Sequence, residues 1–274
     1  MLTTNANICI IGDSFAGHRH SNDSILEKSA SWSWVNLLET NNTGKFSGQG
    51  FPGQSFWHQR RWFLEWQDDR TDRPETVLIF VHTNSWRIPH EKNVPVTGHV
   101  LKADKHSQDN ELWNTDPSGS LFDLAKIFFT SNLYVGEFYQ FAHLAWLQEI
   151  SKLTTRYKKV IHLFGFENKM NDLPNMQNSF CLEQMITDNS IIVKTELMSL
   201  SMAEKGKFGW GGTDDQGKQN HFGEYNNIRL AEFVQYLINE QAPGTSVEIP
   251  VERWKLKNPN LIKLIRLNKD ALEA

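Results

Sequence analysis

The sequence contains little cysteine and no long apolar run. Only two cysteines, Cys9 and Cys181, occur among 274 residues. Cys9 lies inside a short apolar segment, so no structural disulfide is expected and a reducing compartment is favoured. No run approaches the roughly 18 apolar residues of a membrane-spanning helix. No basic segment followed by an apolar one opens the chain. We therefore expect a cytoplasmic protein without a secretion signal or a membrane span.

An excess of positive charge is also absent. The formal net charge is −4 and the sequence pI is near 6.2, so no basic field attracts a nucleic-acid partner. Ten histidines are present, but no two have the i,i+4 spacing with an acidic partner that is typical of helical zinc sites. We expect surface or structural histidines and no metal.

A Gly-Asp-Ser turn directly follows an apolar, mostly β-branched segment at residues 8–11. This segment predicts a buried strand, and the turn places Ser14 at its carboxyl end, where open α/β sheets bind ligands. If a helix follows, its first amides favour negative charge there. The structural alternative is that Ser14 caps such a helix, because Gly-Asp-Ser is also common in turns.

Three later segments place further polar residues at the boundaries of expected elements. Gly53 lies in Gly-Phe-Pro-Gly-Gln-Ser at residues 50–55, Asn84 follows an apolar strand, and His221 precedes the last long helix. Each has a structural alternative: Gly53 permits a tight turn, Asn84 forms a turn, and His221 starts the helix.

Serine, glycine, asparagine and histidine in this order resemble the four blocks of the SGNH (GDSL-type) serine hydrolase/esterase family. The resemblance spans residues 6–84 and 158–241. It implies that Ser14 is the nucleophile and that His221 is its base. The oxyanion would then be held by the backbone N–H groups of Ser14 and Gly53 and by the side chain of Asn84. No cofactor is implied.

The sequence departs from the family pattern at two places. Lys218 stands three residues before His221, where the family has an aspartate, and His82-Thr83-Asn84-Ser85 replaces the usual Gly-x-Asn-Asp. Asp215, or otherwise Asp214 or a backbone carbonyl, would then orient the imidazole. These departures favour the alternative of a non-catalytic binding or virion-associated protein with a degenerate site. An O-acyltransferase that uses the same acyl-enzyme is a further alternative.

Apolar segments alternate between strand and helix patterns along the chain, which predicts an α/β fold with a parallel sheet covered on both faces. The expected strands are 6–11, 45–48, 76–82, 160–164 and 190–193, and the expected helices are 24–40, 54–68, 137–156 and 223–240. The family resemblance implies a flavodoxin-like three-layer sandwich whose five-stranded parallel sheet has the order 2-1-3-4-5.

We expect residues 1–244 to form the hydrolase domain, with an insertion at 85–136 after the third strand. Because the insertion starts beside Asn84, it either covers the substrate or is a lineage-specific addition to the domain. In the first case, Trp86 and Trp113 offer flat apolar surfaces for a sugar ring. Residues 245–274 form a basic, amphipathic C-terminal extension that either contacts an anionic surface or packs on the domain.

Together these features predict an esterase that cleaves a small acyl group, such as acetyl, from a carbohydrate or another polar carrier. Its partner would be a small-molecule or glycan ester.

The replacement of the family aspartate by Lys218 leads to a testable expectation. If Asp215 orients His221, Asp215→Asn should lower kcat on an ester by orders of magnitude, whereas Asp214→Asn should leave it nearly unchanged. Steady-state kinetics of the two variants measures this. Full activity in both would indicate a serine–histidine dyad supported by the backbone.

Overall fold

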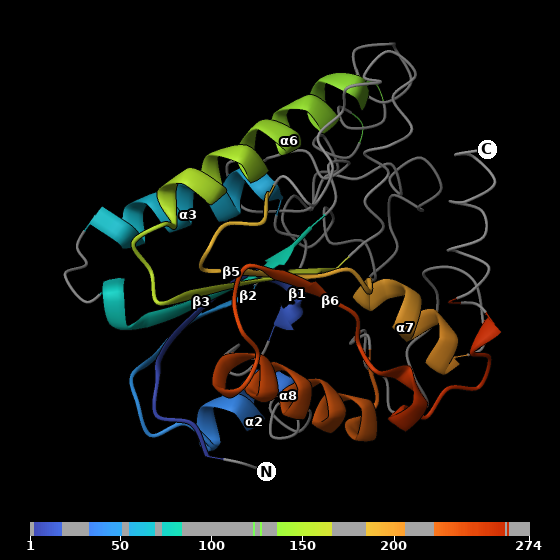
Figure 1. Ribbon diagram of the computed structural model, residues 1–274. Coiled ribbons are helices and arrows are strands. Elements are labelled where there is room, and N and C mark those ends of the chain that lie inside the picture. The colour runs from blue at the N-terminus through green and yellow to red at the C-terminus, as the bar shows by residue number, and fades with distance from the viewer. Residues whose placement is uncertain are drawn as a thin grey trace.

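The chain forms a parallel β-sheet with helices on both faces (Figure 1). This computed structural model describes residues 3–17, 33–50, 55–68, 73–83, 136–165, 185–205, 222–260 and 262, together with Asp123 and Ile127. The strands are β1 (Asn7–Gly17), β2 (Phe46–Gly50), β3 (Thr76–His82), β4 (Lys159–Phe164), β5 (Ser190–Val193) and β6 (Thr245–Val247).

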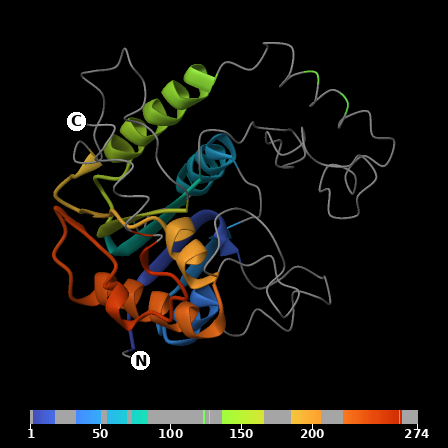
Figure 2. The ribbon, with the colours of Figure 1, turned by 90° about the vertical axis from the view of Figure 1, so that its right-hand side faces the viewer.

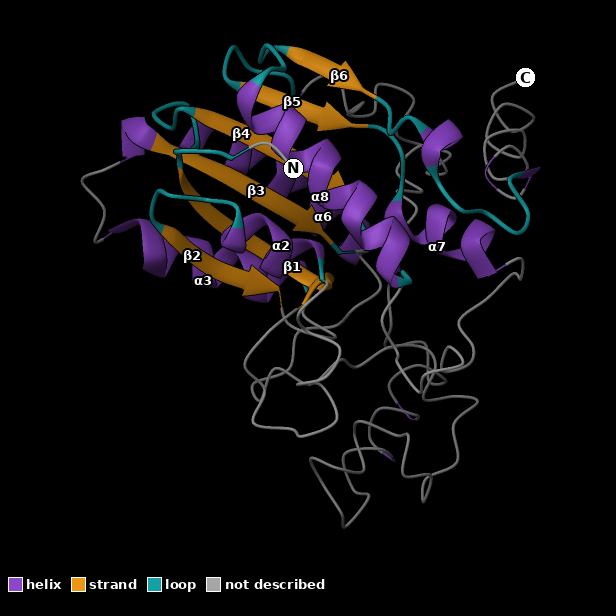
Figure 3. Ribbon diagram, turned by 90° about the horizontal axis from the view of Figure 1, so that it is seen from below, coloured by secondary structure: helices purple, strands orange, loops and turns teal. Residues whose placement is uncertain are grey.

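The described residues form a sheet of six strands, so the expected number of five was wrong. The strand order is β2-β1-β3-β4-β5-β6, and every neighbouring pair is parallel. The added strand, β6, extends the implied order at the β5 edge. It comprises only three half-buried residues, too few to give a period-two pattern in the sequence. Because all strands run the same way, their carboxyl ends lie along one edge of the sheet (Figure 3).

The helices form two layers. Helices α2 (Trp34–Thr40), α7 (Leu197–Lys205) and α8 (Glu224–Asn239) pack on one face of the sheet. Helices α3 (Phe56–Asp68) and α6 (Gly136–Leu153) cover the other face (Figures 1 and 2). The predicted α/β architecture is therefore confirmed. Helix α7 was not expected, because Ser199 and Ser201 interrupt its apolar pattern, although both are buried.

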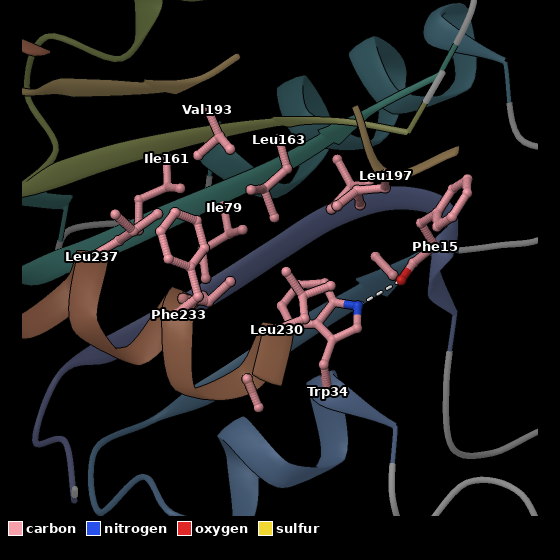
Figure 4. Close-up of a cluster of buried hydrophobic side chains, with 14 of the residues drawn as sticks. Phe15, Trp34, Ile79, Ile161, Leu163, Val193, Leu197, Leu230, Phe233 and Leu237 are labelled. Atoms are coloured by element: carbon pink, nitrogen blue, oxygen red, sulfur yellow. Dashed lines mark hydrogen bonds between the residues drawn. The ribbon is translucent and has the colours of Figure 1, made fainter. Parts of the chain in front are cut away.

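Successive residues of the central strands point to opposite faces of the sheet, so each strand contributes side chains to two hydrophobic cores. Ile10 of β1 and Ile79 of β3 belong to the core on the α8 side of the sheet, and Figure 4 shows Ile79 pointing toward α8. Their neighbours Cys9 and Leu78 pack toward α3 and α6. Burial on both faces explains why these strands read as continuous apolar runs rather than alternating ones.

The described part of the C-terminal extension belongs to the same core. Ile249, Trp254 and Ile262 are buried among the residues of the α8 side of the sheet. The ring of Trp254 meets the ring of Phe222 edge-on, with centroids 5.4 Å apart. Among the helices that the structure describes, none combines the length and apolar character needed to cross a membrane.

A buried lysine holds the C-terminal end of α8. The Nζ of Lys159, at the start of β4, donates hydrogen bonds to the carbonyl oxygens of Leu237, Ile238 and Gln241, each at 2.8 Å. The last carbonyls of a helix lack intrahelical partners and carry partial negative charge. Lys159 satisfies them, although burial lowers the pKa of its ammonium.

We expect Lys159→Met to lower the free energy of unfolding by about 2–3 kcal/mol, because it removes charged hydrogen bonds from buried carbonyls. Urea denaturation measures the change. Lys158→Met is the matched control, since Lys158 is exposed and its loss should cost less than about 0.5 kcal/mol. Equal stability of the two variants would contradict this role of Lys159.

Candidate active site

The carboxyl end of β1 leaves the sheet in a bulge. Gly12 and Gly17 both pair with Gly50 of β2, so the intervening residues 13–16 lie outside the ladder. Ser14 is one of them. A Cβ at Gly50 would overlap the carbonyl oxygen of Asp13, so the absence of a side chain there permits this close approach.

The side chain of Asp13 shapes the turn that contains Ser14. Its Oδ1 accepts the backbone N–H of Phe15 at 3.0 Å, as in an Asx turn. Asp13 is fully buried, and a Cβ at Gly165 would lie 3.0 Å from its Oδ2. The N–H of Gly165, just after β4, donates to the carbonyl of His82 at 2.8 Å. The ends of β1, β3 and β4 are thus in contact around Asp13.

The segment that begins α8 packs against this turn. The rings of Phe15 and Phe222 have centroids 5.8 Å apart. The next residue, Gly223, donates its N–H to both carboxylate oxygens of Glu204 on α7, at 3.0 and 3.1 Å. Phe222 directly follows His221 in the sequence, and Phe15 directly follows Ser14. The structure therefore brings together the immediate neighbours of the two residues expected to react.

The structure describes some of the predicted site residues and not others. The backbone of Ser14 lies in β1, which continues to Gly17, whereas the expected strand ended at residue 11. Outside the described residues lie Gly53, Asn84, Asp215, His221, Trp86 and Trp113. All but Asp123, Ile127 and Gly136 of the 85–136 insertion also lie outside them.

A second serine–histidine contact occurs at the start of α3. Ser55 Oγ and His58 Nδ1 are 3.0 Å apart, and the backbone N–H of His58 is 3.5 Å from the same oxygen. This is the arrangement of a helix N-cap with its N3 residue. Sequence reasoning missed the pair, although a serine three residues before a histidine at a helix start was visible. Both side chains are buried, which favours a structural role.

Three buried histidines lie beneath the carboxyl ends of β3 and β4. His82 Nε2 and His162 Nδ1 are 2.9 Å apart, so one imidazole donates its N–H to the other. The two rings stack at 5.2 Å between centroids, and His143 of α6 stacks on Phe56 at 5.0 Å. The expectation of surface or structural histidines did not single out this group.

The environment of these imidazoles keeps them neutral. Burial, more than the neighbouring imidazoles of His162 and His143, lowers the pKa of His82 well below its ordinary value. Burial also lowers the pKa of His143 to about 3 and the pKa of His162 to about 3. Within the described ranges, no cluster of three or more histidine, cysteine, aspartate or glutamate residues is arranged to hold a metal ion.

Comparison with known proteins gives little further guidance. No family model matches the sequence, and no curated protein matches it. Among solved structures, the chain is similar to a member of the lipolytic protein G-D-S-L family from Veillonella parvula. The TM-score is 0.41 and the sequence identity 12%, over 87% of this chain and 98% of that chain. Similarity at this level carries no argument about function.

The buried histidines predict a specific pH dependence of stability. Below the ordinary histidine pKa of about 6.5, the unfolded chain binds protons that the folded chain excludes, so stability falls as the pH falls from about 6.5 toward 3. Replacing His143 by phenylalanine keeps an aromatic ring beside Phe56 and removes one imidazole that binds a proton only in the unfolded chain. The loss of unfolding free energy between pH 7 and pH 5 should then shrink by about 2 kcal/mol.

Urea denaturation of the wild type and of His143→Phe at both pH values measures this difference. Titrating carboxylates contribute equally to both proteins and cancel in the comparison. An unchanged pH dependence in the variant would show that His143 is protonated in the folded state or does not titrate differently on unfolding.

Proposed function

We propose that the chain is an SGNH-type serine hydrolase that cleaves a carboxylic ester through an acyl-enzyme. The contact between Phe15 and Phe222 carries this proposal, because these residues directly follow Ser14 and His221. Two segments about two hundred residues apart in sequence meet at the edge of the sheet where α/β folds bind ligands. Phe15 lies at the carboxyl end of β1, and Phe222 lies just before α8.

In the proposed reaction, His221 takes the proton of the Ser14 hydroxyl as Ser14 Oγ attacks the ester carbonyl. The N–H groups of Ser14 and Gly53 and the side chain of Asn84 stabilise the oxyanion. The loss of one such donor typically costs about 2.7–4 kcal/mol of barrier. The alcohol leaves with the proton held by His221. A water molecule, deprotonated by His221, then attacks the acyl-serine. The bond to Ser14 Oγ breaks, His221 returns the proton to this oxygen, and the carboxylic acid leaves.

The bulge of β1 supports Ser14 as the nucleophile. It takes residues 13–16 out of the ladder, and the Asx turn of Asp13 fixes the backbone on both sides of Ser14. A backbone held in this way at the edge of the sheet favours a preorganised nucleophile. Asp215 is proposed to orient His221, since the side chain of Lys218 has no oxygen that accepts its N–H.

The proposed substrate is a small acyl ester, such as an acetyl group on a carbohydrate or another polar carrier. Trp86 and Trp113 of the 85–136 insertion would contact the carrier. Lys218 favours a second candidate, a non-catalytic binding protein with a degenerate site. An O-acyltransferase differs from the hydrolase only in the acceptor of the acyl group.

Fluorophosphonate labelling tests the proposal directly. The probe should modify wild-type protein at Ser14, located by mass spectrometry of the labelled peptide, and Ser14→Ala should remain unlabelled. The same variant should lose at least about 10⁴-fold in kcat on p-nitrophenyl acetate. Ser55→Ala is the matched control, since Ser55 also contacts a histidine, and it should keep the labelling. Wild-type protein that is not labelled would favour the binding protein.

A further inference from the structure

The end of β1 is anchored to α2 by a tryptophan. The indole Nε1–H of Trp34 donates to the carbonyl oxygen of Phe15 at 2.6 Å (Figure 4). Trp34 is 1% exposed, and its ring packs in the core between the sheet and α8. A buried carbonyl bonded to a buried donor in this way has little freedom to move. This hydrogen bond therefore fixes the bulge at Phe15, the residue after Ser14.

The start of α8 is anchored to the same tryptophan by an asparagine. Asn227 Oδ1 accepts the backbone N–H of Trp34 at 3.2 Å. Its amide Nδ2 donates to the carbonyls of Phe222 and Gly223, at 3.0 and 3.3 Å. One buried amide thus joins the first residue of α2 to the residue that follows His221.

Helix packing alone does not explain an asparagine at this position. Asn227 is 3% exposed in the first turn of α8, and burying a side-chain amide is unfavourable unless its groups are hydrogen-bonded. Alanine or leucine would fill this helical position with higher helix propensity. Two of the side-chain hydrogen bonds of Asn227 are local, to Phe222 and Gly223, but the third links it to Trp34, 193 residues away in sequence.

We propose that Trp34 and Asn227 are positioning residues that hold Phe15, the residue after Ser14, in place against Phe222, the residue after His221. This inference rests on the proposed hydrolase function. Hydrogen bonds connect the Phe15 carbonyl to Trp34, Trp34 to Asn227, and Asn227 to the Phe222 carbonyl. The rings of Phe15 and Phe222 also contact each other directly. Ser14 precedes Phe15 and His221 precedes Phe222, so each candidate reactive residue is joined by a peptide bond to an anchored residue. A displacement of about 1 Å between reacting groups can cost about 10²-fold in rate.

The matched pair Asn227→Asp and Asn226→Asp tests the proposal. Both replace an amide that donates to a backbone carbonyl, and both keep the acceptor oxygen. Asn226 is also buried, but its side chain bonds with Lys255, accepting its N–H at 3.0 Å and donating to its carbonyl at 3.1 Å. The two variants should lose similar thermal stability.

We expect Asn227→Asp to lower kcat on p-nitrophenyl acetate, and the rate of fluorophosphonate labelling, at least about tenfold with KM within about twofold. Asn226→Asp should keep both rates within about twofold of the wild type. Trp34→Phe removes the indole N–H but keeps an aromatic ring, and it should lower kcat about as much as Asn227→Asp. It also provides the readout if Asn227→Asp fails to fold.

The outcomes separate the two proposals. Wild-type protein that is labelled at Ser14, with equal kcat in all three variants, would overturn the positioning role and leave the hydrolase intact. A fall in kcat for Asn226→Asp equal to that for Asn227→Asp would also overturn it, since it would follow from lost stability alone. Wild-type protein that is not labelled would overturn the hydrolase, and the positioning role with it.

Discussion

Strand β2 approaches the bulge of β1 closely at Gly50, and the bulge itself folds back closely on Gly12, so both positions require glycine. A Cβ at Gly50 would overlap the Asp13 carbonyl, and one at Gly12 would lie 2.7 Å from the Cβ of Ala16. This approach lets the chain leave the ladder after Gly12 and rejoin it at Gly17 while both ends stay paired with one residue. The turn around Ser14 and the contact between Phe15 and Phe222 depend on that geometry.

Much of the sheet could be predicted because its central strands are buried on both faces and appear as continuous apolar runs. The predicted boundaries of β3 and β5 agree with the structure at each end. The return of β1 to β2 at Gly17 was not predictable, since it depends on a pairing that no local pattern contains. Strand β6 was not predictable either, because it forms by pairing with the edge strand β5.

Less of the candidate site could be predicted. The position of Ser14 at a strand end followed from the pattern, whereas Gly53, Asn84, Asp215 and His221 lie outside the described residues and remain predictions. The anchors were missed because tryptophan and asparagine are ordinary at helix starts, and only the fold brings residues so distant in sequence together. The buried histidines were missed because their polarity suggests the surface, while stacked, neutral imidazoles pack as aromatic rings do.

Side-chain hydrogen bonds hold both ends of helix α8 in place. Asn226 and Asn227 in its first turn bond to different segments, and Lys159 holds the carbonyls of its last turn. Inserting one residue between these ends would rotate one end against the other by about 100° and shift it by about 1.5 Å. Both sets of bonds could not then form together. Insertions and deletions among related sequences should therefore fall in the connecting segments, while the length of α8 stays constant.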